Sequence, residues 1–377
     1  MLITGGAGFI GSHTADALLA AGCAVRVLDA LTPPVHPMPV PPAYLDPRIE
    51  FLQGDVRDED TLLTALRGCD AVLHLAAFQD YLPEFHRFFD VNVTSTARIY
   101  ELILRESLAV RRVVVASSQA ALGEGLYVDA EGRELTPDMR PDEQLRRGVW
   151  EIQAPEGFTG PLRSVATDER IANPQNPYGL SKIAEENVAL QLGRRYGIPS
   201  VAMRYSIVQG PRQSFSNPYS GACRVFSMCF AAGRDPVLYE DGQQIRDFVN
   251  IHDVVDANLL ALEDPRTDDE MFHVGGDHAI TVSDFAREVA DCFEVKGYRP
   301  APSGKYRFGD TWHIVSDVSK LRRLGWAPKR TVRDSVAAYR AWLEGMAPAA
   351  EIVDDGLKRM EQLGVVRDVG RAEEDGE

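Results

Sequence analysis

The sequence predicts an α/β protein built on a Rossmann-type, doubly wound parallel sheet. Two observations support this prediction. Short β-branched runs alternate with helical patterns through the first half of the chain, and a glycine-rich turn joins the first strand to the first helix. The chain has 377 residues, of which 45% are hydrophobic and 25% charged, and this is enough for one large domain or two coupled domains.

The predicted elements alternate in order along the chain. Strands are expected at residues 2–4, 24–29, 49–54, 71–76 and 112–117, and helices at 11–21, 58–67 and 92–107. Two later runs, 199–205 and 246–249, are expected to extend the same sheet. Residues 32–47 hold seven prolines in sixteen positions and therefore predict a long, stiff loop. Residues 124–172 are polar and predict an insert or small subdomain with one short helix near 142–147.

The side-chain charges disfavour two classes of partner. The 40 basic and 56 acidic side chains give a net charge of −16, which opposes binding to nucleic acid or to an anionic membrane surface. No apolar run reaches the ~18 residues of a membrane span, and no leader segment is visible at the start. The five cysteines lie at no metal-ligand spacing, so no metal is expected, and the pattern fits a reducing cytoplasm.

The glycine-rich turn has the composition of a dinucleotide site. The letters GGAGFIGS at residues 5–12 place Gly5, Gly8 and Gly11 between a strand and a helix, with Phe9 and Ile10 in the helix start. Glycines there let backbone N–H groups approach a pyrophosphate, and the helix N-terminus attracts the anion. Asp29 ends the next strand, where a carboxylate accepts from both ribose hydroxyls and repels a 2′-phosphate, so NAD is predicted rather than NADP.

Further cofactor contacts are expected where strands three and four end, because ligands in such sheets bind beyond the carboxyl ends of the strands. The residues placed there are Asp55, Val56, Leu75, Ala76 and Ala77. His74, in the apolar strand before them, is expected to be a core histidine rather than a ligand or base.

A tyrosine and a lysine one helical turn apart predict the catalytic base. Tyr178 and Lys182 in YGLSK share one helix face. A phenol has an ordinary pKa of ~10, and a neighbouring ammonium lowers it toward the neutral range. Ser118, at the end of the fifth strand, is placed to donate to the same oxygen and to the reacting substrate oxygen.

Taken together, these motifs resemble the extended short-chain dehydrogenase/reductases that act on nucleotide sugars. The motifs, over roughly residues 1–345, are GGAGFIGS, Asp29, LHLAA, SSQAALGEG, YGLSK, the run from Met203 to Arg212, and IRDFV at 245–249. Within this family the segments 117–120, 210–219 and 240–248 are most similar to dTDP-L-rhamnose 4-epimerases. Those enzymes also carry a long segment between the serine and the tyrosine.

The resemblance implies a role for each matching residue. Tyr178 is the acid/base, Lys182 holds the nicotinamide ribose and lowers the Tyr178 pKa, and Ser118 orients the sugar hydroxyl. Asn92 and Tyr205 join the cofactor site. Substrate contacts are implied for Gln119, Asn217, Tyr219 and the two arginines Arg246 and Arg307, which match positions that bind the diphosphate.

The resemblance also implies an architecture and an assembly. A smaller mixed α/β substrate-binding domain accompanies the Rossmann sheet. Residues 1–205 and 245–275, with the insert 124–172, form the NAD-binding domain, 206–244 and 276–350 bind the nucleotide sugar, and 351–377 form a C-terminal helix and acidic tail. A homodimer is implied, packed through helices 92–107 and 178–196.

The sequence departs from the family at three places. The insert has no cysteine, whereas related epimerases carry cysteine pairs there, so no zinc is expected. Ile207 stands where relatives have an asparagine that contacts substrate, and Leu122 where the serine motif ends in tyrosine. These changes leave the serine, tyrosine and lysine intact but leave the sugar open.

These residues support one leading function and leave several alternatives open. The leading one is redox-neutral 4-epimerisation of a nucleotide-diphosphate sugar. A 4,6-dehydratase is the alternative of the same fold, although Gln119 and Ala120 stand where dehydratases have Asp-Glu, and a decarboxylase or a 4-ketoreductase is a further one. A non-enzymatic NAD-binding sensor or scaffold is the alternative from another class, since Ile207, the altered insert and the acidic tail are unusual.

Overall fold

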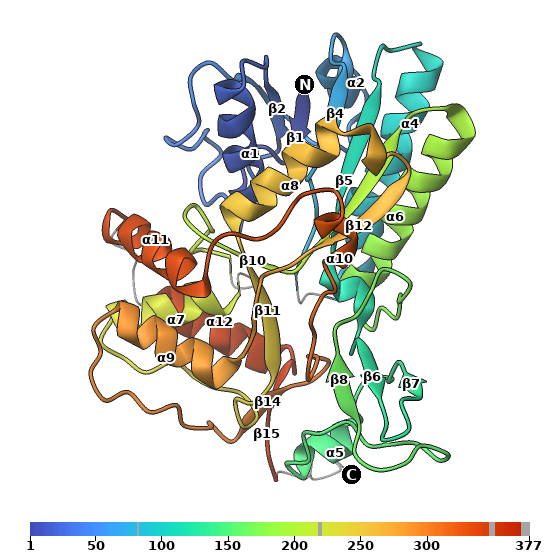
Figure 1. Ribbon diagram of the computed structural model, residues 1–377. Helices are drawn as coiled ribbons and strands as arrows, with labels where there is room; N and C mark the ends of the chain where they lie inside the picture. The colour runs from blue at the N-terminus through green and yellow to red at the C-terminus, as the bar shows by residue number, and fades with distance from the viewer. Residues whose placement is uncertain (81–82, 218–220, 347–350, 371–377) are drawn as a thin grey trace, which may run out of the picture.

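A seven-stranded parallel sheet forms the centre of the computed structural model, which describes residues 1–80, 83–217, 221–346 and 351–370 (Figure 1). Its strand order is β12-β9-β5-β4-β1-β2-β3, and every neighbouring pair is parallel. The strands are β1 (Leu2–Thr4), β2 (Arg26–Asp29), β3 (Glu50–Gln53), β4 (Ala71–His74), β5 (Arg112–Ser118), β9 (Ser200–Tyr205) and β12 (Glu270–Val274). The prediction of a doubly wound Rossmann-type sheet is confirmed.

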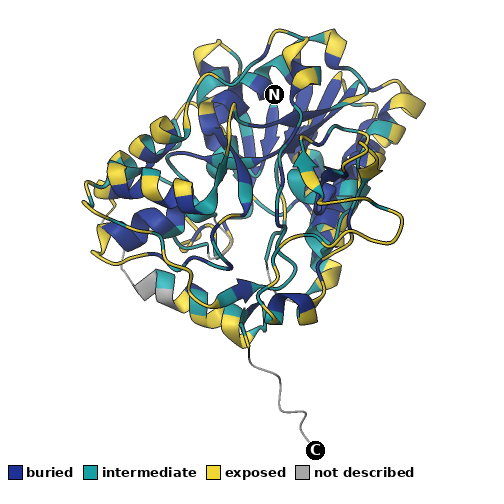
Figure 2. Ribbon diagram, turned by 60° about the horizontal axis from the view of Figure 1, so that its bottom comes forward, coloured by how far each residue is buried: buried dark blue, intermediate teal, exposed yellow. Residues whose placement is uncertain are grey.

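Helices cover both faces of this sheet, so its strands are buried on both sides. On one face α1 (Phe9–Ala20) and α8 (Ile251–Glu263) pack on alternate strand residues, including Ile3, Val27 and Val114. On the other face α2 (Glu59–Leu66), α4 (Ser95–Arg105) and α6 (Pro177–Tyr196) cover the intervening residues, including Leu2 and Val113. Figure 2 shows the resulting buried strands inside a shell of helices with exposed outer faces.

One of the two late strand predictions is wrong. Residues 199–205 join the main sheet as β9, but 246–249 lie in β11 (Ile245–Asn250), which pairs with β10 (Ile207–Gln209) and β13 (Ala279–Thr281) instead. The seventh strand of the main sheet is β12, which the sequence reading missed. The other predicted strands and helices are present, with ends shifted by a few residues.

A small lobe, consisting of β10, β11, β13 and the helices α7 (Ala222–Ala231), α9 (Val282–Cys292) and α11 (Val332–Glu344), lies beside the main sheet (Figure 1). Its core combines aliphatic and aromatic side chains, and within it Phe226 and Phe248 pack on Phe285 at ring-centroid distances of 5.8 and 4.3 Å. This hydrophobic core is separate from the two cores that lie on the two faces of the main sheet.

The predicted insert 124–172 folds as a small subdomain. Its strands β6 (Leu126–Val128), β7 (Glu134–Leu135) and β8 (Arg163–Val165) form an antiparallel sheet in the order β7-β6-β8. The expected short helix is present as α5 (Asp142–Arg146). The proline-rich segment 32–47 contains neither helix nor strand, as predicted.

Short elements complete the chain. They are α3 (Phe85–Phe89), the π-helix η1 (Asp90–Thr94), the 3-10 helices η2 (Gln119–Leu122) and η3 (Pro265–Thr267), β14 (Lys305–Arg307), α10 (Ser319–Arg322), α12 (Glu351–Gln362) and β15 (Val366–Asp368). β15 returns to pair antiparallel with β14. The acidic tail 371–377 lies outside the described residues. None of the helices in the described ranges is long and apolar enough to cross a membrane.

Candidate active site

The glycine-rich turn between β1 and α1 is packed so closely that side chains do not fit. Gly5 has a left-handed φ of +66°, and a Cβ there would lie 2.8 Å from the backbone nitrogen of Ala76. A Cβ on Gly11 would lie 2.6 Å from the Gly5 carbonyl oxygen. The N-cap of α1 is Gly8, which offers no side chain to the first N–H groups of the helix. These donors, with Phe9 and Ile10 in the first turn, are available to a phosphate group.

Asp29 lies at the end of β2 beside this turn. Its carboxylate accepts hydrogen bonds from the backbone N–H groups of Ala7 at 3.0 Å and Leu31 at 2.9 Å. The proline-rich loop folds over it, because His36 Nε2 lies 3.8 Å from Asp29 Oδ1 and the Tyr44 hydroxyl donates to the Ala7 carbonyl at 2.8 Å. Each carboxylate oxygen keeps a lone pair for a ribose hydroxyl.

The ends of β3 and β4 converge on the same edge of the sheet. The backbone N–H groups of Leu75 and Ala76 donate to the carbonyl and hydroxyl oxygens of Thr4 at 3.1 and 3.3 Å, which fixes the segment 75–77 that includes Ala77. Val56 is buried in the core. The Asp55 carboxylate is bound by Arg57 at 2.7 Å, which holds its pKa below the usual value.

His74 is a core histidine, as predicted. Its Nδ1 lies 2.6 Å from the Thr4 hydroxyl and its Nε2 lies 2.9 Å from the Ser95 hydroxyl. Burial lowers the pKa of His74 to about 3, so the ring is neutral.

Helix α6 presents Tyr178 and Lys182 toward the end of β5. Asn176 caps the helix by accepting from Gly179 N at 2.8 Å, and a Cβ on Gly179 would lie 2.5 Å from the Ala120 carbonyl oxygen. This close approach of α6 to η2 lets Ser118 hydrogen-bond the Tyr178 phenol. Lys182 Nζ lies 5.8 Å from the centroid of the Tyr178 ring and donates to the Ala116 carbonyl oxygen at 2.8 Å.

The electrostatic balance at Tyr178 differs from the simple expectation. Burial raises the pKa of Tyr178, the Lys182 ammonium and the Ser118 hydrogen bond lower it, and the Glu185 carboxylate raises it. The net pKa lies above the ordinary value, because burial outweighs the lysine. The sequence predicts the effect of the lysine but neither the burial of Tyr178 nor the nearby Glu185 carboxylate.

Asn92 lies in the π-helix η1, an irregular turn of the kind that occurs at functional sites. Its amide oxygen accepts from Phe78 N at 2.7 Å, and its amide nitrogen donates to the Ser181 hydroxyl at 2.9 Å. Asn92 therefore joins the segment after β4 to α6, one residue from Lys182.

The two predicted diphosphate arginines meet at one acid. Arg246 Nη2 lies 3.3 Å and Arg307 Nη1 lies 3.8 Å from Asp310 Oδ2, and together they lower the pKa of this carboxyl despite its burial. Arg246 also donates to the carbonyl oxygens of Thr311 and Trp312 at 2.8 and 3.0 Å. The structure brings both arginines to one carboxylate, and their binding to a diphosphate stays a prediction.

The remaining predicted residues have different surroundings. The amide oxygen of Gln119 is buried without a hydrogen-bond partner in the described part of the chain. The Tyr205 hydroxyl donates to Asn258 at 2.6 Å inside the core, so only its backbone is left for the cofactor site. Asn217 is the last residue before the gap at 218–220, and Tyr219 lies outside the described residues.

The two unusual apolar residues also have clear positions. Leu122 is fully buried in η2, and Ile207 packs at the edge of the small-lobe core. Neither side chain is polar, so neither position offers a side-chain hydrogen bond.

Sequence reasoning missed a buried charge network beside the arginines. Arg140 of the insert contacts Glu240 at 3.0 Å and Glu124 at 3.3 Å, and Glu124 accepts from Trp312 N at 2.6 Å. Burial raises the pKa of Glu124 to about 7. No spacing or motif in the sequence marks these residues; only their packing brings them together.

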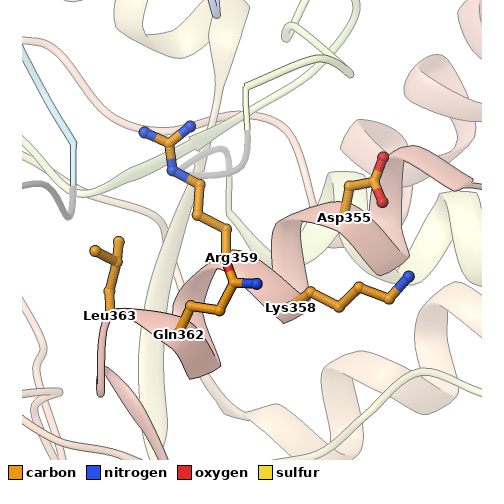
Figure 3. Close-up of a pocket in the computed structure, with 5 residues that line it drawn as sticks. All are labelled: Asp355, Lys358, Arg359, Gln362 and Leu363. Atoms are coloured by element: carbon orange, nitrogen blue, oxygen red, sulfur yellow. The ribbon is translucent and has the colours of Figure 1, made fainter.

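A hollow of about 490 Å³ lies along α12, lined by Asp355, Lys358, Arg359, Gln362 and Leu363 (Figure 3). None of the predicted site residues lines it. Among the described residues, no group of three or more His, Cys, Asp or Glu side chains is arranged to hold a metal ion.

Comparisons with known proteins identify relatives of this chain and structures with the same fold. Residues 1–144 and 153–275 match the family described as "NAD dependent epimerase/dehydratase family". A dTDP-L-rhamnose 4-epimerase of Burkholderia thailandensis is 33% identical, with 91% of this chain and 94% of that protein covered. Two solved structures have the same fold. The Thermus thermophilus UDP-glucose 4-epimerase with NAD has TM-score 0.71 and 27% identity, covering 91% of this chain and 98% of that one. The Streptomyces venezuelae dTDP-glucose 4,6-dehydratase with NAD has TM-score 0.70 and 26% identity, covering 91% and 96%.

Proposed function

Because the chain belongs to the NAD dependent epimerase/dehydratase family, we propose that it is a nucleotide-sugar 4-epimerase acting on a dTDP-linked 6-deoxyhexose. The observation that carries the proposal is the convergence of Ser118, Tyr178 and Lys182, with Gln119 and Ala120 next in the chain. Neither of these two residues is an acid that could eliminate water. The dTDP-sugar is inferred from the relative at 33% identity and from the segments at 117–120, 210–219 and 240–248.

The residues around the glycine-rich turn fit NAD. The close-packed turn, the uncapped start of α1 and the Asp29 carboxylate suit a pyrophosphate and an adenine ribose with a free 2′-hydroxyl. Bound NAD supplies the acceptor, and later the donor, of the hydride at C4 of the sugar. Lys182 would hold the ribose, and Asn92 of η1, which donates to Ser181 beside Lys182, holds the adjoining backbone.

Tyr178 handles the proton in this proposal. It takes the proton of the C4 hydroxyl while the sugar is oxidised to the 4-ketose, and it returns that proton when the ketose is reduced on its opposite face. Ser118 hydrogen-bonds the same phenol and orients the sugar oxygen. Arg246 and Arg307 hold the diphosphate so that the sugar turns while the nucleotide stays bound.

Several further assignments belong to the same proposal. A homodimer would pack through α4 and α6, which expose Leu104, Leu180 and Tyr196 to between 41% and 48%. The enzyme would work in the cytoplasm, in keeping with five free cysteines. Light scattering on the purified protein tests the dimer.

The test of function is a direct assay. Purified protein with dTDP-L-rhamnose and other dTDP-, UDP- and GDP-sugars is followed by NMR, and interconversion of 4-epimers without added reductant is the expected result. Tyr178→Phe is expected to abolish it. Accumulation of a 4-keto-6-deoxy sugar would assign the chain to the dehydratases instead. Bound NAD with no change in any sugar would favour a sensor or scaffold.

A further inference from the structure

Lys182 is tied to an acid on its own helix that no motif predicts. Lys182 Nζ lies 2.7 Å from Glu185 Oε2, and the two residues are one turn apart on α6. Lys182 and Glu185 are 1% and 0% exposed, respectively. With the bond to the Ala116 carbonyl at 2.8 Å, two of the three ammonium N–H groups are occupied by the protein.

Among the described residues, Lys182 is the cation that pairs with the Glu185 carboxylate. Its other oxygen, Oε1, is buried and accepts no hydrogen bond from any described residue. Glu186 also acts on Glu185, but Arg204 binds Glu186 through Nε at 2.7 Å and Nη2 at 2.8 Å.

Three further titratable groups face this pair. The Glu185 carboxylate raises the pKa of both Tyr178 and Tyr205. The Lys182 ammonium lowers the pKa of His74, whose ring is neutral. None of the three brings a positive charge, so the ammonium and the carboxylate compensate each other inside the protein.

An ammonium beside a phenol favours the phenolate, and a carboxylate beside the same phenol disfavours it. Both charges act on Tyr178 here. We propose that Glu185 is a positioning residue that acts through Lys182: it holds the ammonium against the Ala116 carbonyl and offsets its charge beside Tyr178. This offset opposes the effect of the ammonium on the phenol. The proposal rests on the proposed function only for its link to turnover.

Such an offset suits a base that must give its proton back. In a redox-neutral cycle Tyr178 both removes and returns the proton of one hydroxyl, so a phenol that is too acidic would slow the return. Burial raises the pKa of Glu185, and the Lys182 ammonium at 2.7 Å opposes that rise.

The test uses Glu185→Gln, which removes the charge but keeps the length and an acceptor oxygen. Phenolate absorbance of the NAD-free protein is titrated with pH, and the titration of a Tyr178→Phe background is subtracted to isolate Tyr178. The midpoint is expected to fall by about one pH unit, because the ammonium is no longer offset. An unchanged or higher midpoint overturns the proposal.

One variant serves as a control for this titration, and another replaces Glu185→Gln if that protein does not fold. Glu186→Gln, one residue further on, removes a buried acid that is already paired with Arg204, and its Tyr178 midpoint is expected to shift much less. If circular dichroism shows that Glu185→Gln is unfolded, Glu185→Met, of similar volume, takes its place with the same expected direction. If the Tyr178 titration midpoint shifts equally in the Glu185 and Glu186 variants, the proposal is also overturned.

A second readout links the effect to turnover. The rising limb of the pH profile of kcat/KM is expected to move to lower pH in Glu185→Gln, in step with the phenolate midpoint. The phenolate titration needs no sugar, so a lack of 4-epimerase activity would overturn the proposed function while the titration still decides the role of Glu185. If the rising limb of kcat/KM moves to higher pH in Glu185→Gln, the role given to Glu185 is overturned, whereas the proposed 4-epimerase function is not.

Discussion

Arg140 of the insert donates from both terminal nitrogens to the two carboxylate oxygens of Glu240 in the small lobe, at 3.0 and 3.1 Å. Both side chains are only 2% exposed. Arg140 also donates to the carbonyl oxygens of Trp150 and Asp310 at 3.0 and 2.9 Å. The insert is thus joined by one buried cation to the segment that carries Arg307.

The first prediction concerns the stability that this cation provides. Arg140→Met leaves the Glu240 and Glu124 carboxylates buried without their partner, which is expected to lower the free energy of unfolding by about 3–5 kcal/mol. Urea denaturation measures it. Arg170→Met, which breaks an exposed pair with Asp168, is the control and should leave the unfolding midpoint unchanged. A similar midpoint for both variants would contradict the role given to Arg140.

The second prediction concerns the choice of cofactor. Asp29→Ser removes the carboxylate that is placed to accept the ribose hydroxyls, so NAD is expected to bind about 10- to 100-fold more weakly. The same change removes the repulsion of a 2′-phosphate, so the preference for NAD over NADP should shrink. Calorimetric titration of both cofactors measures this, with Asp46→Ser as the control. Unchanged discrimination would show that Asp29 does not set it.

The third prediction separates binding from chemistry at the diphosphate. Arg307→Gln removes one cationic fork from the Asp310 cluster, and KM for the nucleotide sugar is expected to rise about 10- to 100-fold with little change in kcat. Arg322→Gln, which breaks an exposed pair with Asp277, is the matched control. A fall in kcat at constant KM would place Arg307 in the chemical step instead.

The fourth prediction follows from the neutral ring of His74. The unfolded chain binds a proton there below the ordinary pKa of 6.5, whereas the folded protein binds it only near pH 3. Stability is therefore lost as pH falls from 6.5 toward 3, by about 2–3 kcal/mol at two units below 6.5. His74→Gln is expected to make this loss smaller by that amount, measured by urea denaturation at pH 7 and 4.5. His278→Gln, at an exposed side chain, should not change it.

The parts of the fold that the sequence predicted are those with local signals. The period-2 and period-3.6 patterns located five strands and the helices between them, and the strand ends located Ser118 and Asp29. The sequence predicts the strand at 246–249 but not the sheet to which it belongs. Pairing of β11 with β10 and β13, and of β12 with β9, is decided by packing between segments far apart in the chain.

The missed parts of the site are charged residues whose role depends on burial. Glu185 and Glu186 are adjacent acids in the sequence, yet one binds Lys182 and the other Arg204. A helix pattern alone predicts solvent for both, since charged residues are seldom buried without partners. Arg140 is likewise an unremarkable residue of a polar insert until its partners at 124 and 240 are placed around it.

The pairing of β14 with β15 determines which parts of the chain can fold first while the protein is being synthesised. Arg307 lies opposite Val366, and Lys305 opposite Asp368, so this strand pair joins segments about sixty residues apart. On the ribosome the first six strands of the main sheet emerge early and can fold with the glycine-rich turn already in place. Arg307, which we propose to bind the diphosphate, gains its strand partner only when the last described part of the chain has left the exit tunnel. We therefore expect a nascent chain stalled before residue 366 to hold the complete glycine-rich turn while Arg307 still lacks its strand partner.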